Sequence, residues 1–220
     1  MRKLYLFLFT LIYINVNAQD TITIKHSNYK TTYSKSLNYP IVVEWWETTK
    51  KSYCPEKLIR SNDFKPDPNL KGYTDIGKYY ITINKLQKIK GLKTLDRGHM
   101  CPARVNLCLG KDIELECFYY SNITPQYHAL NGGDWKILET FTYDTSIKKD
   151  SIHVWAGSVG VSIKALKINV PKQCWKVIHI KKDNIWLAYL FNNDTSKSNG
   201  IDDNKVNVEV IEKLTGLKFK

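Results

Sequence analysis

The residues whose types could do chemistry gather in one short stretch near the middle of the chain. Asp96-Arg97-Gly98-His99 combines a carboxylate, a guanidinium and an imidazole, and Asn131 and Glu139 follow downstream. Histidine has an unperturbed pKa of about 6.5 and can take a proton from an attacking water. Arginine binds phosphate oxygens, and amide or carboxylate oxygens suit a hard divalent cation. Together these residues predict a site that cleaves phosphodiester bonds.

Two strands and a helix are needed to bring these side chains together. If residues 95–99 end a strand, Arg97 and His99 project from the same face, and Gly98 between them permits a close approach by backbone or ligand. A second strand would carry Asn122, and a helix would start near Asn131. Asp96 is expected to fix geometry at the strand end. The predicted order is strand, strand, helix.

Asn131 and Glu139 would have different tasks on that helix. Their spacing of eight residues corresponds to roughly 12 Å of rise and about 80° of rotation, so both cannot easily bind one small ion. Asn131 is the predicted metal ligand, and Glu139 is predicted to orient waters around the ion. Mg²⁺, or Mn²⁺ or another divalent cation, fits a site with so few protein ligands, because it keeps several waters and binds substrate phosphate.

The order of the motifs resembles the DNA/RNA non-specific endonuclease family. The resemblance rests on Asp96 to Ala103, Ser121 to Gln126, and Leu130-Asn131 with Trp135 and Glu139. It extends more weakly to Arg60, Phe64 and Asp67-Pro68, to Val170-Pro171 with Trp175-Lys176-Val177, and to the closing segment from Leu214 to Phe219. It therefore covers most of the chain from about Tyr39 onward.

Membership of that family implies a ββα-metal nuclease fold with a mostly antiparallel central sheet flanked by helices. It also implies hydrolysis of DNA and RNA, a single divalent ion and 5′-phosphate ends. By position, His99 matches the general base, Asn131 the metal ligand and Glu139 the carboxylate of the water network. Arg97, Asn122 and Arg60 match supporting residues, with Arg60 and Arg97 expected to bind substrate.

The first 18 residues look like a secretory signal peptide rather than part of the fold. A basic start at Arg2 and Lys3 precedes an apolar run, which ends in small or neutral residues at 16–18. The run is too short for a transmembrane anchor, which needs about 20 apolar residues. We therefore expect residues 19–220 to form a single endonuclease domain that is secreted or periplasmic and has no stable membrane association.

The chain is strongly basic, which favours a polyanionic partner. Its formal charge is +12, and loss of Arg2 and Lys3 with the signal peptide leaves +10. Such a surface attracts DNA and RNA at long range, although many soluble basic proteins bind neither. The sequence leaves open a homodimer and a protein inhibitor.

In an exported protein, the five cysteines are expected to form disulfides, and an odd number leaves one unpaired. Cys101, two residues after His99, could tie the active-site strand through a disulfide or remain a free thiol. Zinc is the competing use, but no C-x-x-C spacing supports it. The five are Cys54, Cys101, Cys108, Cys117 and Cys174.

The remaining pattern indicates an α+β class, because strands and helices alternate irregularly. A surface loop is predicted at residues 61–71, and helices at residues 131–141 and 208–214, the second capped by Gly216. Trp45 and Trp46 should point to opposite faces of one strand, and Trp135 should be core. The predicted strands are residues 41–46, 80–83, 118–124, 151–156, 175–180 and 185–191.

Two other classes of function remain open from the sequence. A polyanion-binding protein without catalysis would share the charge, and a small-molecule phosphodiesterase would share the site without needing the basic surface. The other four histidines are expected to be structural: His26, His128, His153 and His179.

Overall fold

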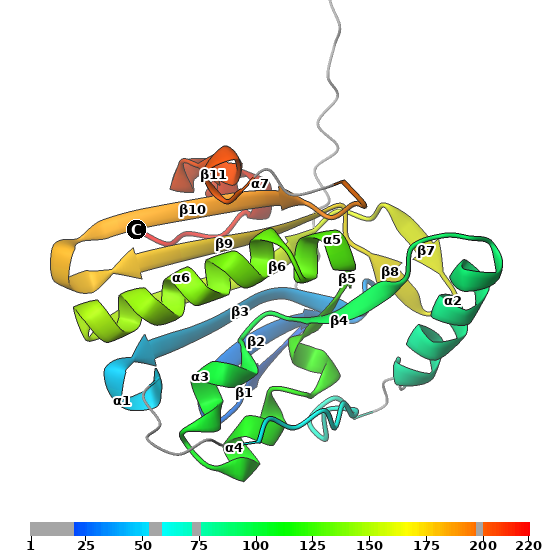
Figure 1. The fold of residues 1–220 in the computed structure, drawn as a ribbon, viewed down its shortest axis with the longest axis horizontal. Helices are drawn as coiled ribbons and strands as arrows, with labels where there is room; N and C mark the ends of the chain where they lie inside the picture. Colours follow the sequence, from blue (N-terminus) through cyan, green and yellow to red (C-terminus); the bar gives the residue numbers. More distant parts are fainter. Residues whose placement is uncertain (1–19, 53–58, 72–75, 197–199) are drawn as a thin grey trace, which may run out of the picture.

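A computed structural model describes residues 20–52, 59–71, 76–196 and 200–220 (Figure 1). The predicted signal peptide at residues 1–18 and Cys54 lie outside the described residues. Among the described residues, no helix combines the length and apolar character needed to cross a bilayer.

A large antiparallel sheet organises the described part of the molecule (Figure 1). Its strand order is β1-β2-β3-β6-β9-β10-β11. Strands β3 and β6 pair antiparallel in the interior of the sheet, with β1 and β2 on one side and β9, β10 and β11 on the other. The bounds are β1 Thr21–Lys25, β2 Tyr29–Ser34, β3 Tyr39–Thr48, β6 Ser151–Val159, β9 Gln173–Ile180, β10 Ile185–Asn192 and β11 Lys205–Val206.

The two faces of the sheet are covered by different helices because side chains alternate along each strand. On β9, Cys174 and Ile178 pack in the same core cluster as Trp135 and Leu138 of α6 (Asp134–Lys149). The intervening Trp175 and Val177 pack with α7 (Val208–Thr215) in a separate cluster. The sheet is therefore buried on both faces, with α6 on one and α7 on the other.

A smaller unit lies on the α6 side of the sheet. Strand β4 (Leu95–His99) pairs antiparallel with β5 (Ile123–Tyr127), which leads into α5 (His128–Asn131) and then α6. This is the predicted strand, strand, helix order. A 3-10 turn, η2 (Tyr120–Asn122), enters β5, so Asn122 precedes the strand rather than lying within it.

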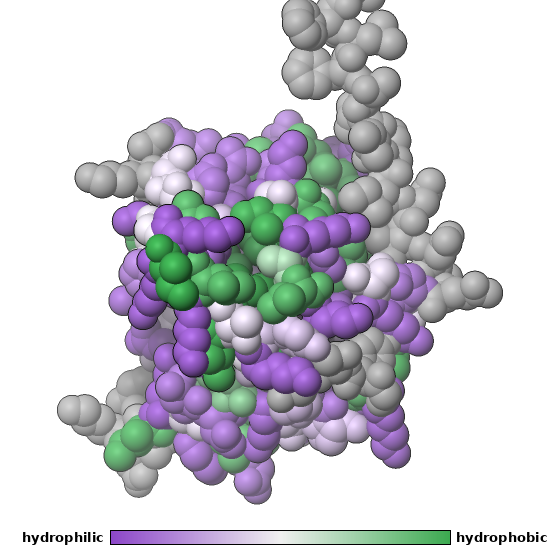
Figure 2. Space-filling view, turned by 90° about the vertical axis from the view of Figure 1, so that its right-hand side faces the viewer, coloured by the Kyte–Doolittle hydropathy of each residue, from purple (hydrophilic) through white to green (hydrophobic). Residues whose placement is uncertain are grey.

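The remaining elements surround this frame. Figure 2 shows the face on the side of α2 and β7, where hydrophobic side chains gather amid a hydrophilic surround. The large apolar side chains exposed on these two elements include Ile81, Leu86, Ile89 and Ile163. The bounds are α1 Thr49–Ser52, α2 Gly77–Ile89, α3 Ala103–Leu107, α4 Lys111–Glu116, β7 Ile163–Ala165, β8 Ile168–Val170, η3 Lys181–Asp183 and η4 Asp202–Asn204.

Most predicted strands are confirmed, and two predictions about helices and strands are wrong. Residues 80–83 belong to helix α2, whose buried residues Tyr80 and Ile83 lie one turn apart while Ile81 is exposed. The helix predicted from residue 131 starts at Asp134, because Gly132 and Gly133 separate it from α5.

The predicted strand at residues 118–124 is only partly confirmed, since η2 occupies residues 120–122. The tryptophan predictions are confirmed: Trp45 is 1% exposed, Trp46 is 37% exposed and Trp135 is fully buried. Gly216 ends α7 in the left-handed region with φ of 75°, as predicted for its cap.

Candidate active site

The β4–β5 pair places His99 where the small unit meets the core. His99 lies opposite Ile123 and Gly98 opposite Thr124. The next helix holds the strand end, because Trp135 of α6 donates a hydrogen bond from Nε1 to the His99 carbonyl oxygen at 3.1 Å. The backbone that carries the predicted base is therefore fixed by both neighbouring elements.

Two phenylalanines enclose the His99 ring. Its centre lies 5.3 Å from that of Phe64 and 4.9 Å from that of Phe118, and the side chain is buried. The two phenylalanines also contact each other edge to face, at 5.1 Å between centres. Within the described residues, Nε2 of His99 has no hydrogen-bond partner. An unpartnered nitrogen in an apolar niche can accept a proton from a bound water or substrate.

Two arginines lie against the same phenylalanines. The Arg97 guanidinium carbon lies 4.0 Å from the centre of Phe64, and that of Arg60 lies 5.4 Å from Phe118. Both arginine side chains are exposed. Burial, and after it the charges of Arg60 and Arg97, lower the pKa of His99 to about 3. The imidazole is therefore neutral at physiological pH, beside two cations that can bind an anion.

Asn131 is oriented by Asp96, the first residue of the Asp96-Arg97-Gly98-His99 stretch. Its Nδ2 donates to Oδ2 of Asp96 at 2.9 Å, and the same carboxylate oxygen lies 2.8 Å from His128 Nδ1. Asp96 is predicted to fix geometry at the strand end, and in the structure its carboxylate fixes the amide orientation of Asn131. With Nδ2 engaged by the carboxylate, Oδ1 is the end of the amide that can serve as a metal ligand.

The chemistry of the side chains near Asn131 limits which metal ion could bind there. The described residues contain no group of three or more His, Cys, Asp or Glu side chains that could hold a metal ion. One amide oxygen suits an ion that keeps most of its waters and gains substrate phosphate as a ligand, and Mg²⁺ behaves in this way. The residues present thus fit a magnesium ion.

Glu139 lies on α6, one turn after Trp135, and is partly exposed. Burial raises its pKa, while the positive charges of Lys176 and Arg60 oppose that shift. The charge of Arg60 therefore acts on the pKa of both His99 and Glu139.

Asn122 is placed differently from the other predicted site residues. It is fully buried, and its Oδ1 accepts from the Cys101 backbone nitrogen at 2.9 Å. Its Nδ2 donates to the carbonyl oxygens of Cys101 and Cys117, both at 2.9 Å. With both ends of its amide hydrogen-bonded to backbone, Asn122 ties together the segments of Cys101 and Cys117.

The cysteines near the site are thiols. Cys101, Cys117 and Cys174 are free and buried, and Cys108 is disulfide-bonded. Of the two alternatives for Cys101, the structure has the free thiol. Asn106 Nδ2 contacts the Cys117 sulfur and lies 3.4 Å from that of Cys101.

Sequence reasoning missed the roles of four residues that shape the site. Phe64 and Phe118 enclose His99, and two buried charged residues, Glu47 and Lys176, interact electrostatically with Glu139. The last two carried a usable signal, because each occupies a core position of a strand pattern: Val43-x-Trp45-x-Glu47 and Cys174-x-Lys176-x-Ile178. A charged residue on the apolar side of a strand is seldom buried without a function or a partner.

Comparison with known proteins agrees with this geometry. The model of the DNA/RNA non-specific endonuclease family matches residues 10–220. Similar proteins include the mitochondrial nuclease EXOG of Xenopus laevis, 28% identical over 176 residues, which cover 71% of this chain and 46% of the relative. A nuclease of Serratia marcescens is 31% identical over 172 residues, which cover 72% and 61%.

The human mitochondrial nuclease EXOG is 27% identical over 177 residues, covering 71% of this chain and 45% of the relative. The chain thus spans about half the length of the curated relatives that it matches. A solved structure of the EndoG/EndoGI complex, concerned with EndoG inhibition, shares the fold with a TM-score of 0.76. It covers 90% of this chain and 84% of that chain at 23% identity, which confirms the predicted ββα-metal nuclease fold.

Proposed function

Because the chain belongs to the DNA/RNA non-specific endonuclease family, we propose that it is an exported endonuclease that hydrolyses DNA and RNA. The proposal includes one divalent ion, normally Mg²⁺, His99 as general base and products with 5′-phosphate ends. The observation that supports it best is the neutral, buried His99 with an unpartnered Nε2 beside the Arg97 and Arg60 cations.

His99 would take the proton of the attacking water at Nε2. Its lowered pKa keeps the imidazole neutral in the unbound enzyme, and the tautomer with its proton on Nδ1 would leave Nε2 able to accept a proton. The phosphate brings negative charge close to Arg97 and Arg60, which makes the imidazole a stronger base once substrate is bound. The two guanidiniums would bind non-bridging phosphate oxygens, where they stabilise the charge of the transition state.

Asn131 would hold the ion through Oδ1, with Asp96 fixing the amide. A bound divalent ion neutralises charge on the phosphate and stabilises the departing oxygen. Glu139 would orient the waters around the ion, and Asn122 would position the segments of Cys101 and Cys117 rather than touch substrate.

Export is proposed from the leader-like residues 1–18 and the basic composition, with residues 19–220 as one domain. The disulfide-bonded Cys108 is compatible with an oxidising compartment. The EndoG/EndoGI structure makes a protein inhibitor a reasonable partner to seek, and a homodimer remains a prediction.

Incubation with supercoiled plasmid and with RNA, with Mg²⁺ or with a chelator, tests the proposed function. We expect both substrates to be degraded only with Mg²⁺, and His99→Ala to lower the rate by roughly 10²–10⁴-fold, the usual contribution of a general base. His179→Ala is the matched control, because His179 lies on the α7 side of β9.

The outcomes separate the alternatives. Retention of full activity by His99→Ala in a folded protein would refute the mechanism. Binding of DNA without cleavage by the wild-type protein would favour the inactive polyanion-binding protein. Hydrolysis of bis(p-nitrophenyl) phosphate without cleavage of plasmid would favour the small-molecule phosphodiesterase.

A further inference from the structure

Lys176 is a fully buried cation in the core beneath the candidate site. It lies in the middle of β9, opposite Ala156 of β6 and Tyr189 of β10. Its neighbours Cys174 and Ile178 on the same strand face belong to the core cluster on the α6 side. A lysine rarely occupies such a position unless its charge is compensated.

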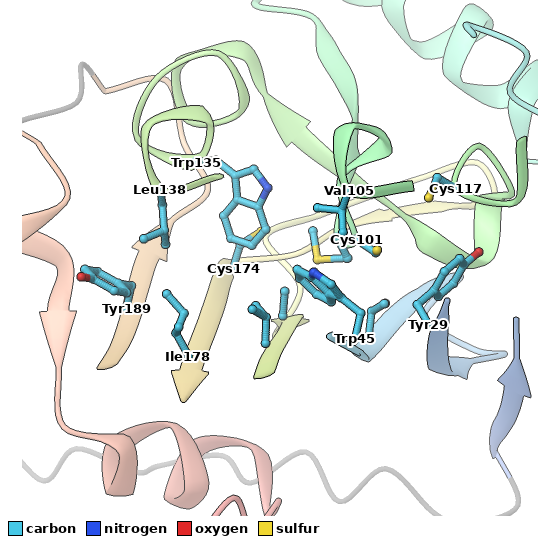
Figure 3. Close-up of a cluster of buried hydrophobic side chains, with 14 of the residues drawn as sticks. Tyr29, Trp45, Cys101, Val105, Cys117, Trp135, Leu138, Cys174, Ile178 and Tyr189 are labelled. Carbon is cyan, nitrogen blue, oxygen red and sulfur yellow. The ribbon is translucent and has the colours of Figure 1, made fainter. Parts of the chain in front are cut away.

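Two indoles flank the ammonium group. Nζ of Lys176 lies 4.3 Å from the centre of Trp135 and 5.8 Å from that of Trp45. Figure 3 shows these two tryptophans entering one cluster, Trp135 from α6 and Trp45 from the sheet. Cation–π contact favours a charged lysine, but within the described residues Nζ has no hydrogen-bond partner. The charge must therefore be balanced through space.

Two carboxylates can provide that balance, and they differ in their connection to the site. Glu47 of β3 is fully buried; its Oε1 accepts from Trp45 Nε1 at 3.0 Å, and its Oε2 has no partner among the described residues. Glu139 is partly exposed and lies one turn after Trp135 on α6, the helix whose indole Lys176 contacts, and the charges of Lys176 and Arg60 act on it. Glu47 thus lies deep in the core, and Glu139 extends from the core to the surface of the site.

The two carboxylates do not need the lysine equally. Burial raises the pKa of Glu47 to about 7, so this group can lose its charge at little cost near neutral pH. Lys176 and then Arg60 are the largest opposing influences on the pKa of Glu139, and of these Arg60 is exposed and is proposed to bind substrate. Once phosphate engages Arg60, Lys176 is the main cation left to compensate Glu139, ahead of Lys136.

Given the proposed nuclease function, we propose that Lys176 is a positioning residue for Glu139. Its buried ammonium, held between Trp45 and Trp135, compensates the Glu139 carboxylate and keeps it directed at the waters around the divalent ion. Lys176 touches neither substrate nor ion in this role. A purely structural lysine would instead compensate the charge of Glu47. The two roles predict different Mn²⁺ affinities when Lys176 and Glu47 are changed together.

The experiment measures Mn²⁺ binding to a stable protein–DNA complex. The background variant His99→Ala holds a short DNA duplex without cleaving it, and electron paramagnetic resonance gives the Mn²⁺ dissociation constant. In this background we compare Lys176→Met, Lys176→Met with Glu47→Gln, Glu139→Gln, and Glu139→Gln with Lys176→Met. Lys148→Met is the control, because it removes the same charge from an exposed position on α6.

We expect Lys176→Met to weaken Mn²⁺ binding roughly 10–100-fold, the usual effect of losing a residue that supports a metal site indirectly. Adding Glu47→Gln should restore the melting temperature without restoring Mn²⁺ affinity. In the Glu139→Gln background, Lys176→Met should have less than about a twofold effect, because its partner is already neutral. Lys148→Met should bind Mn²⁺ like the background variant.

Three results would overturn the inference: unchanged Mn²⁺ affinity in Lys176→Met, recovery of affinity in the variant with Glu47→Gln, or failure of both of these variants to fold. Any of them would leave Lys176 a structural residue. If the wild-type protein fails to cleave DNA with Mg²⁺ and its His99→Ala complex binds no Mn²⁺, the proposed function itself fails. If the wild-type protein cleaves DNA normally but the Lys176 variants bind Mn²⁺ as tightly as the Lys148→Met control, the positioning role alone fails.

Discussion

At the scale of single residues, the most consequential feature is the pairing of a buried imidazole with exposed cations. His99 is desolvated by Phe64 and Phe118, and the Arg60 and Arg97 charges disfavour its protonated form. Burial is the main cause of the low pKa, and the two arginine charges lower it further. Substrate phosphate, by neutralising the two cations, would remove their part of the shift and strengthen the proposed base.

The charge of Arg60 can be tested apart from catalysis by titrating His99 in the free protein. Arg60→Gln removes a positive charge that disfavours the imidazolium, so the pKa of His99 should rise from about 3 towards its ordinary value. NMR of the histidine ring carbons measures the midpoint, and loss of one signal in His99→Gln identifies it. The acid limb of kcat/KM, which reports the free enzyme, should move to higher pH in the same direction.

Arg104→Gln is the control for that titration. Arg104 is also exposed, but it stacks on Tyr143 at 3.4 Å and is not among the charges that act on His99. An unmoved or lowered midpoint in Arg60→Gln would show that Arg60 does not act on the base.

Residue types could be predicted from the sequence more readily than their environments. The pattern predicts roles for His99, Arg97 and Asn131, but it cannot show that Asp96 binds Asn131, since their contact joins residues far apart in the chain. The pattern also predicts Asn122 near the chemistry, and in the structure both ends of its amide bond the backbone of Cys101 and Cys117. Contacts of this kind depend on tertiary structure alone.

At the scale of elements, the β4–β5 pair is held by close packing around Gly98. A methyl group at this position would overlap the side chain of Gln126, a fully buried residue of β5. The sequence suggested that Gly98 lets backbone or ligand approach, and the structure assigns that space to a neighbouring side chain. The backbone of Gly98 has no positive φ, so the requirement is one of space alone.

Gly98→Ala should therefore destabilise the protein by about 1–3 kcal/mol, the usual cost of overpacking a tight core. The free energy of unfolding from urea denaturation measures this. In a Gln126→Ala background the same substitution should cost clearly less, because the overlapping atoms are gone. Equal costs in the two backgrounds would show that the crowding lies elsewhere.

The elements around the site were predicted unevenly for a physical reason. Strands buried on both faces carry continuous apolar runs, and those at residues 151–156, 175–180 and 185–191 were found. Helix α2 was mistaken for a strand because its Tyr-Tyr-Ile-Thr-Ile run is rich in β-formers, while packing buries only Tyr80 and Ile83. The loop containing Phe64 looks like ordinary surface, yet Lys65 bonds the backbone of Phe118 and Tyr120 and fixes Phe64 at the site.

At the scale of the whole molecule, the two faces of the sheet differ in chemical character. Its α6 face carries the buried charges and the candidate site, and its α7 face is closed by Trp175, Val177 and Ile211. The small ββα unit therefore packs against the large sheet. The contacts of α6 with β3 and β6 hold this unit in position on the sheet. The fold class was predictable from the resemblance, whereas the division between the two faces was not.

The net charge gives a last prediction that concerns the complete protein. With a formal charge of +12 for the chain, encounter with a polyanion should be steered by the whole surface and not by the two site arginines alone. Long nucleic acid should then lose affinity steeply as salt rises, because the release of condensed counterions on binding becomes less favourable, with a logarithmic slope of about −0.7 to −0.9 per phosphate contact. A small phosphodiester engages few charges and should respond weakly.

We therefore expect kcat/KM on plasmid DNA to fall roughly tenfold or more between about 50 and 200 mM salt. Hydrolysis of bis(p-nitrophenyl) phosphate by the same preparation should change by less than about twofold, because few contacts are screened. Arg60→Gln should make the plasmid slope shallower by about one unit if Arg60 binds a phosphate. Equal salt responses for both substrates would mean that the basic surface plays no part in substrate capture, and the protein would then have to be considered a small-molecule phosphodiesterase.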